Sequence, residues 1–295
     1  MKARKTVVGT MLTEVRSPEI LRAIAAAGLD FVFLDTEHSS YDLQMVNDLI
    51  RAGRSTELSC YVRVPDPEYF LIARTLDAGA HGIMAPRVET EEQVKRVIAA
   101  TKYPPKGKRG YGVRPIITDF ETAPVEEWME KLNEDTMIIL QIESKKAIDN
   151  IDQLVSLEGV DAAVIGPNDL SISLGVPGQL DHPIMVEHIE KVVEACKKYG
   201  VVPGAHFGNL EMLEYWRDRG MRMLTYSTDI DLLMNAARSA IKRLELWSEK
   251  SQNLYYRNDP PGATPVTKGD KSEARNRKSS ILPHLRIGCE GKILV

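Results

Sequence analysis

Met137-Ile-Ile-Leu-Gln-Ile-Glu-Ser144 contains an apolar run that ends in a carboxylate, directly before a helical pattern begins. A short apolar run with such a boundary is typical of a strand buried in a parallel sheet. A second run, Ala162-Ala-Val-Ile-Gly166, follows after one helix-length segment and ends in Pro167-Asn-Asp169. The sequence therefore predicts two neighbouring parallel strands, each with an acidic residue at its carboxyl end.

Strands and helices alternate over the first 250 residues. Apolar segments that fit strands lie at residues 6–13, 31–34, 58–64, 82–86, 137–143, 162–166, 201–206 and 221–226. A helical pattern follows each one, the last from Ile230 to about Glu249. This alternation is typical of a (β/α)₈ barrel. An open doubly wound sheet is the rival fold, but it would show fewer strands, and the G-x-G-x-x-G turn of a dinucleotide site is absent.

Composition and charge exclude several classes of protein. The chain is 43% hydrophobic and 27% charged, which is ordinary for a globular protein, and its net charge of −4 argues against a nucleic-acid partner. No apolar run approaches the roughly 20 residues needed to span a bilayer. The N-terminus lacks an apolar signal core, and Cys60, Cys196 and Cys289 have no pairing or metal-type spacing. We therefore expect a cytoplasmic protein with no membrane partner.

Residues 251–295 differ in composition from residues 1–250. They contain Pro260-Pro-Gly262, show no periodicity, and carry eight Lys or Arg against four Asp or Glu. This material predicts a flexible or irregular C-terminal extension attached to a barrel domain of residues 1–250.

Polar residues at the carboxyl ends of the predicted strands are the candidates for chemistry, because barrel active sites lie at that face. They are Asp35, Glu37, His38, Arg63, Gln141, Glu143, Asn168, Asp169 and His206. For any one of them the alternative interpretation is a solvated loop end or a helix cap.

Glu143 and Asp169 are the best candidates for metal ligands. Two carboxylates with no cysteine nearby suit a hard cation such as Mg²⁺ or Mn²⁺. Two protein ligands also leave coordination positions open for water and a chelating substrate. The alternative is that Glu143 merely ends a strand while Asp169 caps the following turn.

Acid–base and charge-stabilising roles have their own candidates. His38 is the acid–base candidate, because an imidazole is the side chain suited to exchange protons near neutral pH, and Asp35, three residues earlier, is placed to orient it. Arg63 is permanently charged and suits a carboxylate or a developing enolate oxygen, or else a salt bridge to a loop acid. Asp77 precedes a helix C-cap glycine, where the helix dipole disfavours a carboxylate, so we expect a compensating partner. His206 is better explained as a packed histidine.

Two missing features narrow the chemistry. No predicted strand contains a lysine for a Schiff base, and no G-x-S-x-G nucleophile elbow is present. The remaining hypothesis is metal-assisted chemistry through a chelated enolate.

Six segments in one order resemble the HpcH/HpaI aldolase family, the class II pyruvate aldolases that cleave 4-hydroxy-2-oxo acids. The resemblance covers residues 6–248, and macrophomate synthase and 2,4-dihydroxyhept-2-ene-1,7-dioate aldolase-like enzymes belong to the same family. The segments are Asp35-Thr-Glu-His38, Val62-Arg-Val-Pro65, Leu76-Asp-Ala-Gly-Ala80, Pro104-Pro-Lys-Gly-Lys-Arg-Gly-Tyr-Gly112, Gln141-Ile-Glu-Ser144 and Ile165-Gly-Pro-Asn-Asp-Leu-Ser171.

The resemblance implies a barrel of the phosphoenolpyruvate/pyruvate type with a divalent metal, Mg²⁺, Mn²⁺ or Co²⁺. In that family Glu143 and Asp169 would bind the ion, and pyruvate would chelate it through its keto and carboxylate oxygens. Backbone amides of the segment Gly166-Pro167-Asn168 would hold the pyruvate carboxylate, and Gln141 would lie near the metal.

The resemblance also implies the remaining catalytic roles and an assembly. Arg63 would stabilise the enolate, and His38, oriented by Asp35, would move the substrate hydroxyl proton. Asp77 would approach the active site of a neighbouring subunit in a hexamer built from trimers, and the helix from Ile230 would pack on a neighbour. The substrates would be a small 2-oxo acid and an aldehyde.

Departures from the family pattern leave the substrate open. Ser39-Ser-Tyr41 replaces the commoner Gly-Pro after the histidine, and His81-Gly-Ile-Met-Ala-Pro-Arg87 varies at the fourth strand. Two other functions stay open. One is an acyl-CoA lyase of the citrate lyase β type, with Lys106, Lys108 and Arg109 for the CoA phosphates. The other is a non-catalytic metabolite-binding barrel.

Overall fold

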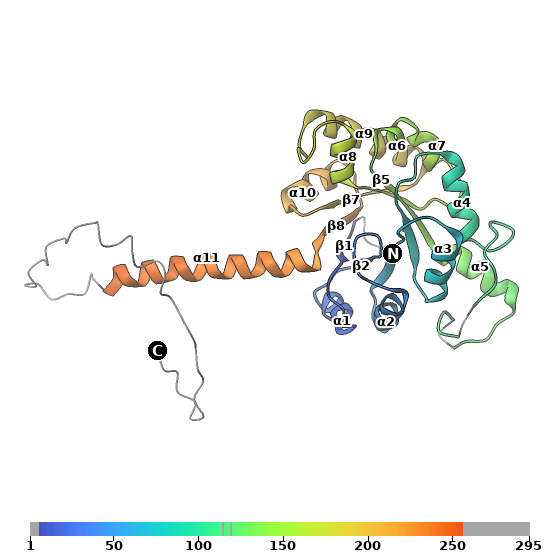
Figure 1. Ribbon diagram of the computed structural model, residues 1–295, viewed down its shortest axis with the longest axis horizontal. Helices are drawn as coiled ribbons and strands as arrows, with labels where there is room; N and C mark the ends of the chain where they lie inside the picture. Colours follow the sequence, from blue (N-terminus) through green and yellow to red (C-terminus); the bar gives the residue numbers. More distant parts are fainter. Residues whose placement is uncertain (1–5, 114, 119, 256–295) are drawn as a thin grey trace, which may run out of the picture. The chain divides into compact units, whose positions relative to one another are not determined.

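A computed structural model describes residues 6–255 apart from 114 and 119, with side chains described as far as Leu244. Eight parallel strands close into a barrel in sequence order, β1 to β8 (Figure 1). This arrangement confirms the predicted (β/α)₈ fold and excludes the open doubly wound sheet. The strands are β1 (Val7–Leu12), β2 (Phe31–Asp35), β3 (Ser59–Arg63), β4 (Gly82–Ala85), β5 (Met137–Ile142), β6 (Ala162–Ile165), β7 (Val202–Phe207) and β8 (Met223–Thr228).

Helices connect the strands, and most begin where the sequence places them. They are α1 (Glu19–Ala26), α2 (Leu43–Arg54), α3 (Tyr69–Asp77), α4 (Glu91–Thr101), α5 (Val125–Asp135), α6 (Lys145–Asp149), α7 (Ile151–Val155), α8 (Pro167–Ser173), α9 (Pro183–Tyr199), α10 (Leu210–Asp218) and α11 (Asp229–Tyr255). The single helix expected over residues 146–157 is divided into α6 and α7 at Asn150, where φ is −103° and ψ is 9°. Helix α8 was not predicted from the sequence; it follows β6 directly and carries Asp169 in its first turn.

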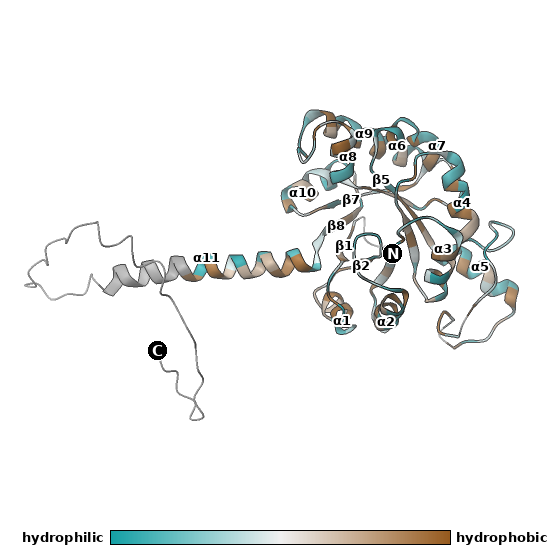
Figure 2. Ribbon diagram, viewed as in Figure 1, coloured by the Kyte–Doolittle hydropathy of each residue, from teal (hydrophilic) through white to brown (hydrophobic). Residues whose placement is uncertain are grey.

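The core has two parts on the two faces of the sheet. Alternate strand residues face the helices, and the others point into the barrel, where Phe31, Phe33, Tyr61, Met84 and Ile139 form the inner cluster. The helices show brown and teal in alternation along their length in Figure 2, as amphipathic helices do. The barrel interior is therefore filled by side chains on its amino-terminal side, and polar residues begin above this cluster.

Strand register brings the polar residues to one level. Asp35 lies opposite Arg63 in the β2–β3 pair, and His206 lies opposite Thr225 in the β7–β8 pair. Because side chains alternate between the two faces of a strand, Asp35 points inward with Phe31 and Phe33. The carboxyl end of the barrel therefore carries a polar layer directly above the apolar one.

The chain divides into two units between Ser239 and Ala240, and α11 runs through this boundary. In the first unit, α11 exposes Ile230, Leu233 and Met234. The helix continues six residues beyond Glu249, where the sequence expectation ended it, so residues 251–255 are helical and not irregular. The rest of the expected extension, with Cys289, lies outside the described residues. None of the helices in the described ranges has the length and hydrophobicity required to cross a bilayer.

Candidate active site

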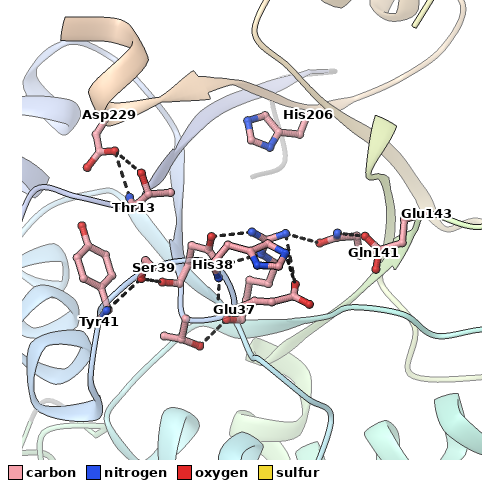
Figure 3. A network of polar contacts seen from close by, with 12 residues as sticks. Thr13, Glu37, His38, Ser39, Tyr41, Gln141, Glu143, His206 and Asp229 are labelled. Atoms are coloured by element: carbon pink, nitrogen blue, oxygen red, sulfur yellow. Dashed lines mark hydrogen bonds and ion pairs between the residues drawn. The ribbon is translucent and has the colours of Figure 1, made fainter. Parts of the chain in front are cut away.

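Four buried polar side chains lie at the ends of β2, β3 and β5, and Figure 3 labels two of them, Gln141 and Glu143. They are Asp35, Arg63, Gln141 and Glu143, and each is less than a tenth exposed. Buried charges are costly unless they are paired or hydrogen-bonded, so such a concentration is typical of a functional site.

Asp35 and Arg63 form a bidentate ion pair. The Arg63 Nε donates to Asp35 Oδ1 over 2.8 Å, and its Nη2 donates to Oδ2 over 2.6 Å. Burial raises the pKa of Asp35, but the hydrogen bonds and charge of Arg63 outweigh burial and lower it. Burial lowers the pKa of Arg63, yet its carboxylate neighbours, Asp35 first, raise it overall. Both groups are therefore charged, and the guanidinium is held in one orientation.

The Glu143 carboxylate is fixed at both oxygens. Its Oε1 accepts the backbone N–H of Arg87 over 2.7 Å, and its Oε2 accepts Nε2 of Gln141. The glycine at position 166 permits this packing, because a Cβ there would lie 3.0 Å from Glu143 Oε2. The main chain at the end of β6 can therefore approach Glu143 closely, with Asp169 three residues further on.

Glu143 and Asp169 together fit a divalent cation. Burial raises the pKa of Glu143, the hydrogen bonds from Arg87 and Gln141 oppose this, and the charges of Glu37 and Asp169 raise it further. A cation between the two carboxylates would offset their repulsion, and oxygen donors are those that Mg²⁺ and Mn²⁺ prefer. Within the described residues no cluster of three or more His, Cys, Asp or Glu is placed to hold a metal.

The segment from Gly166 to Asn168 offers fewer amides than the family resemblance implies. The Gly166 N–H already donates to Ile142 O over 3.0 Å, and Pro167 has no N–H. Asn168 is exposed in the first turn of α8, where amides have no intrahelical acceptor. Only Asn168 of the three is therefore available to hold a carboxylate through its main chain.

His38 is less constrained than expected. Its side chain is 64% exposed, and its Nε2 lies 3.9 Å from Glu37 Oε2. Asp35 accepts the His38 backbone N–H over 3.3 Å, but its two carboxylate oxygens are engaged by Arg63. Arg63 therefore holds both oxygens of the Asp35 carboxylate, and Glu37 is the acid beside the His38 ring. Orientation of the imidazole by Asp35 stays a prediction.

Glu37 and Arg87 complete the site, although neither was assigned a role from the sequence. The Glu37 side chain is 6% exposed and pairs with Arg87 Nη1 at 2.8 Å and with Arg63 Nη1 at 3.4 Å. Its Oε2 has no hydrogen-bond donor within the described part of the chain. The departure at His81–Arg87 from the family pattern was the one signal that pointed to Arg87.

Asp77 has the compensating partner that its position predicted. It ends α3 and accepts Arg109 Nη2 over 2.6 Å, and the Arg109 guanidinium stacks 4.7 Å from the centre of the Tyr103 ring. Arg109 is 3% exposed and neutralised by Asp77, which removes it from a CoA-phosphate site. The approach of Asp77 to a neighbouring subunit stays a prediction.

His206 is on β7, next to β8, and Figure 3 shows its ring apart from the network of contacts around His38 and Gln141. Its Nε2 contacts Ser227 O at 3.1 Å, and Ser227 has a left-handed φ of 59°. Burial, together with the charge of Arg63, lowers the pKa of His206 to about 4. His206 is therefore a neutral, packed histidine at physiological pH, as the sequence interpretation favoured.

Comparisons with known proteins agree with this geometry. The HpcH/HpaI aldolase/citrate lyase family model matches residues 10–236. The chain is 33% identical over 213 residues to a hydroxypyruvate/pyruvate aldolase of Roseobacter denitrificans, covering 72% of this chain and 83% of the relative. It is 35% identical over 184 residues to a 5-keto-4-deoxy-D-glucarate aldolase of Salmonella paratyphi A, covering 62% and 71%.

Solved structures give the same result. An HpcH/HpaI aldolase from Desulfitobacterium hafniense superposes with a TM-score of 0.78 at 36% identity, covering 88% of this chain and 96% of the other. Macrophomate synthase superposes with a TM-score of 0.73 at 27% identity, covering 83% and 86%. A citrate lyase β subunit from M. tuberculosis, at 17% identity and a TM-score of 0.50, shares the fold alone. The chain therefore belongs to the HpcH/HpaI aldolase/citrate lyase family.

Proposed function

We propose that this protein is a divalent-metal-dependent aldolase that cleaves a 4-hydroxy-2-oxo acid reversibly to pyruvate and an aldehyde. The observation that carries the proposal is the connection between a fixed arginine and a buried carboxylate at the barrel mouth. Asp35 holds the charged Arg63, and Gln141 contacts both Arg63 and the buried Glu143. Asp169 follows the next strand, β6, in the first turn of α8. The names of relatives that are aldolases support the same reaction class.

The chain's own residues provide the electrostatic part of this reaction. As the C3–C4 bond breaks, its electron pair moves toward C2, and negative charge develops on the C2 oxygen of the enolate. The fixed Arg63 guanidinium would stabilise that oxygen without reorganising, because Asp35 holds it beforehand. Glu143 and Asp169 would hold the divalent cation, which when bound supplies Lewis-acid polarisation of the 2-oxo group.

Proton transfer requires a base near the substrate 4-hydroxyl. His38 is the proposed base, because its imidazole is exposed at the mouth and Glu37 lies 3.9 Å from Nε2. The Glu37 carboxylate would stabilise the imidazolium after the proton arrives. In the cleavage direction the hydroxyl proton passes to His38 as the C3–C4 bond breaks and the aldehyde carbonyl forms. C3 of the enolate then takes a proton from water, His38 returns its proton to water, and pyruvate leaves.

We also propose that the protein assembles as a hexamer built from trimers. Exposed apolar residues at the start of α11, Ile230, Leu233 and Met234, support a contact with a second copy. Light scattering on the purified protein measures the mass directly. A monomer of 33.0 kDa would contradict this part of the proposal.

Pyruvate release from a panel of 4-hydroxy-2-oxo acids tests the function. The protein is assayed with EDTA, then with Mg²⁺, Mn²⁺ or Co²⁺ restored, alongside Glu143→Ala and the matched control Glu187→Ala, an exposed glutamate on α9. We expect release that requires added metal and disappears only in Glu143→Ala. Metal-independent release would contradict the mechanism, and metal binding without any release would favour a non-catalytic barrel or an acyl-CoA lyase.

A further inference from the structure

A closed ring of polar contacts joins five residues around the mouth of the barrel. Glu143 accepts from Gln141, and Gln141 Oε1 lies 3.5 Å from Arg63 Nη1. Arg63 Nη1 lies 3.4 Å from Glu37 Oε2, and Glu37 Oε1 lies 2.8 Å from Arg87 Nη1. The ring closes where the backbone N–H of Arg87 donates to Glu143 Oε1 over 2.7 Å. Arg87 thus contacts Glu143, the proposed metal ligand, through its backbone N–H. Its guanidinium contacts Glu37, which lies beside Arg63, the proposed enolate-binding residue.

The backbone of Arg87 is in a conformation that favours glycine. Its φ is 54°, in the left-handed region, and a residue with a Cβ pays for that conformation. The residue follows β4 and Pro86, and in this conformation its N–H reaches across to Glu143 at the end of β5. The strained backbone and the contact to the carboxylate therefore occur at the same residue.

The Arg87 side chain is anchored on the opposite side of the ring. Its Nη1 donates to Glu37, its Nη2 donates to the main-chain carbonyl of Pro65, and Nη2 lies 3.7 Å from Asp66 Oδ2. The end of the side chain therefore binds the segment after β3, although the side chain is 55% exposed. An arginine offers several N–H groups in a rigid fork for such contacts, and a lysine does not.

We propose that Arg87 is a positioning residue for the cation site, a role that rests on the proposed function. The anchored guanidinium holds residue 87 in its left-handed conformation, and this conformation keeps the backbone N–H on Glu143 Oε1. One oxygen of Glu143 is thereby fixed before the cation arrives. Residues that orient a metal ligand in this way commonly affect metal affinity as well as activity.

Calorimetric titration of the metal-free protein with Mn²⁺ tests the role directly. The variant is Arg87→Met, and the matched control is Arg96→Met, an exposed arginine on α4. We expect Arg87→Met to bind Mn²⁺ about tenfold more weakly, with the Mn²⁺ concentration for half-maximal activity raised equally and kcat at saturating Mn²⁺ largely kept. Arg96→Met should match the parent protein.

Two further variants separate positioning from folding and from charge. Arg87→Gly relieves the left-handed conformation but, like Arg87→Met, leaves Glu37 without its partner at 2.8 Å, so it should melt no lower than Arg87→Met while still binding Mn²⁺ weakly. Arg87→Lys keeps the charge and should bind nearly as weakly as Arg87→Met. Parent-like Mn²⁺ affinity in Arg87→Gly or Arg87→Lys would overturn the role of Arg87 alone. A parent protein that binds no Mn²⁺ would overturn the proposed function together with it.

Discussion

The two ends of the barrel both bury charged side chains, but they satisfy them differently. At the amino-terminal end, Lys102 is 5% exposed and donates to the main-chain carbonyls of Asn133 and Thr136, over 2.6 and 2.5 Å. Asp161 at the same end accepts the backbone N–H of Ile138 over 2.7 Å. These charges are therefore bound mainly by the backbone of the segments that enter the strands.

At the carboxyl end the buried charges bind one another. Asp35 is paired with Arg63, Arg63 also faces Glu37, and Glu143 keeps its raised pKa among other carboxylates. The Glu37 Oε2 atom has no hydrogen bond among the described residues. From this difference we expect the amino-terminal charges to stabilise the fold, and the carboxyl-terminal charges to form the site that we propose binds the substrate and its cation.

Substitution of Glu143 by Gln should have the largest effect on activity. It should also distinguish most clearly a site that serves activity from one that serves stability. Loss of a hydrogen bond to a metal ligand costs up to roughly a hundredfold in activity. Activity of Glu143→Gln should fall by more than this, because the substitution removes a proposed ligand itself. The folded pKa of Glu143 is raised, so its charge costs stability as pH rises through that pKa. Urea denaturation at pH 8 should therefore find metal-free Glu143→Gln more stable than the parent protein. A less stable variant would mean that Glu143 serves the fold.

Replacement of Arg63 by Lys should come next in size. Lysine cannot reproduce the two parallel contacts to Asp35, so we expect kcat/KM to fall roughly a hundredfold, the cost of losing one aligned oxyanion donor. Mn²⁺ affinity should change little, since Glu143 and Asp169 remain. A fall in Mn²⁺ affinity equal to the fall in kcat/KM would show that Arg63 acts through the cation site instead.

Lys102→Met should show the opposite pattern. Two buried carbonyls would lose their donor, at about 2–4 kcal/mol in total. Urea denaturation should record this loss, while kcat/KM per folded molecule stays at the parent value. Lys191→Met, at an exposed lysine of α9, is the matched control. If fully folded Lys102→Met showed a reduced kcat/KM, Lys102 would serve the active site as well as the fold, and the distinction between the two ends would be wrong.

The smallest expected effect concerns His206. Its folded pKa of about 4 lies below the ordinary 6.5, so the unfolded chain binds the extra proton and stability falls as pH drops from about 6.5 toward 4. Between pH 7.5 and 5.5 this should cost about 1 kcal/mol. His206→Gln should remove that slope in urea denaturation and leave the pH–rate profile above pH 6 unchanged. An altered profile would assign His206 a catalytic role.

The position of each strand and the polar residue at its end could be predicted from the sequence. Apolar runs such as residues 137–142 and 162–165 lie where buried strands form, and Glu143 and Asp169 follow them. Family resemblance named the same residues and also Asp77, whose compensating partner proved to be Arg109. These features are local, since a few successive residues determine each one.

Only closure of the barrel decided which charge binds which. Asp35 is three residues from His38 but is taken by Arg63, 28 residues away, because β2 and β3 pair in a register that aligns them. Glu143 receives its hydrogen bond from Arg87, 56 residues earlier, through a left-handed backbone that no local pattern predicts. Sequence periodicity determines elements and their ends, whereas competition among buried charges is settled by distances that exist only after the eight strands have closed.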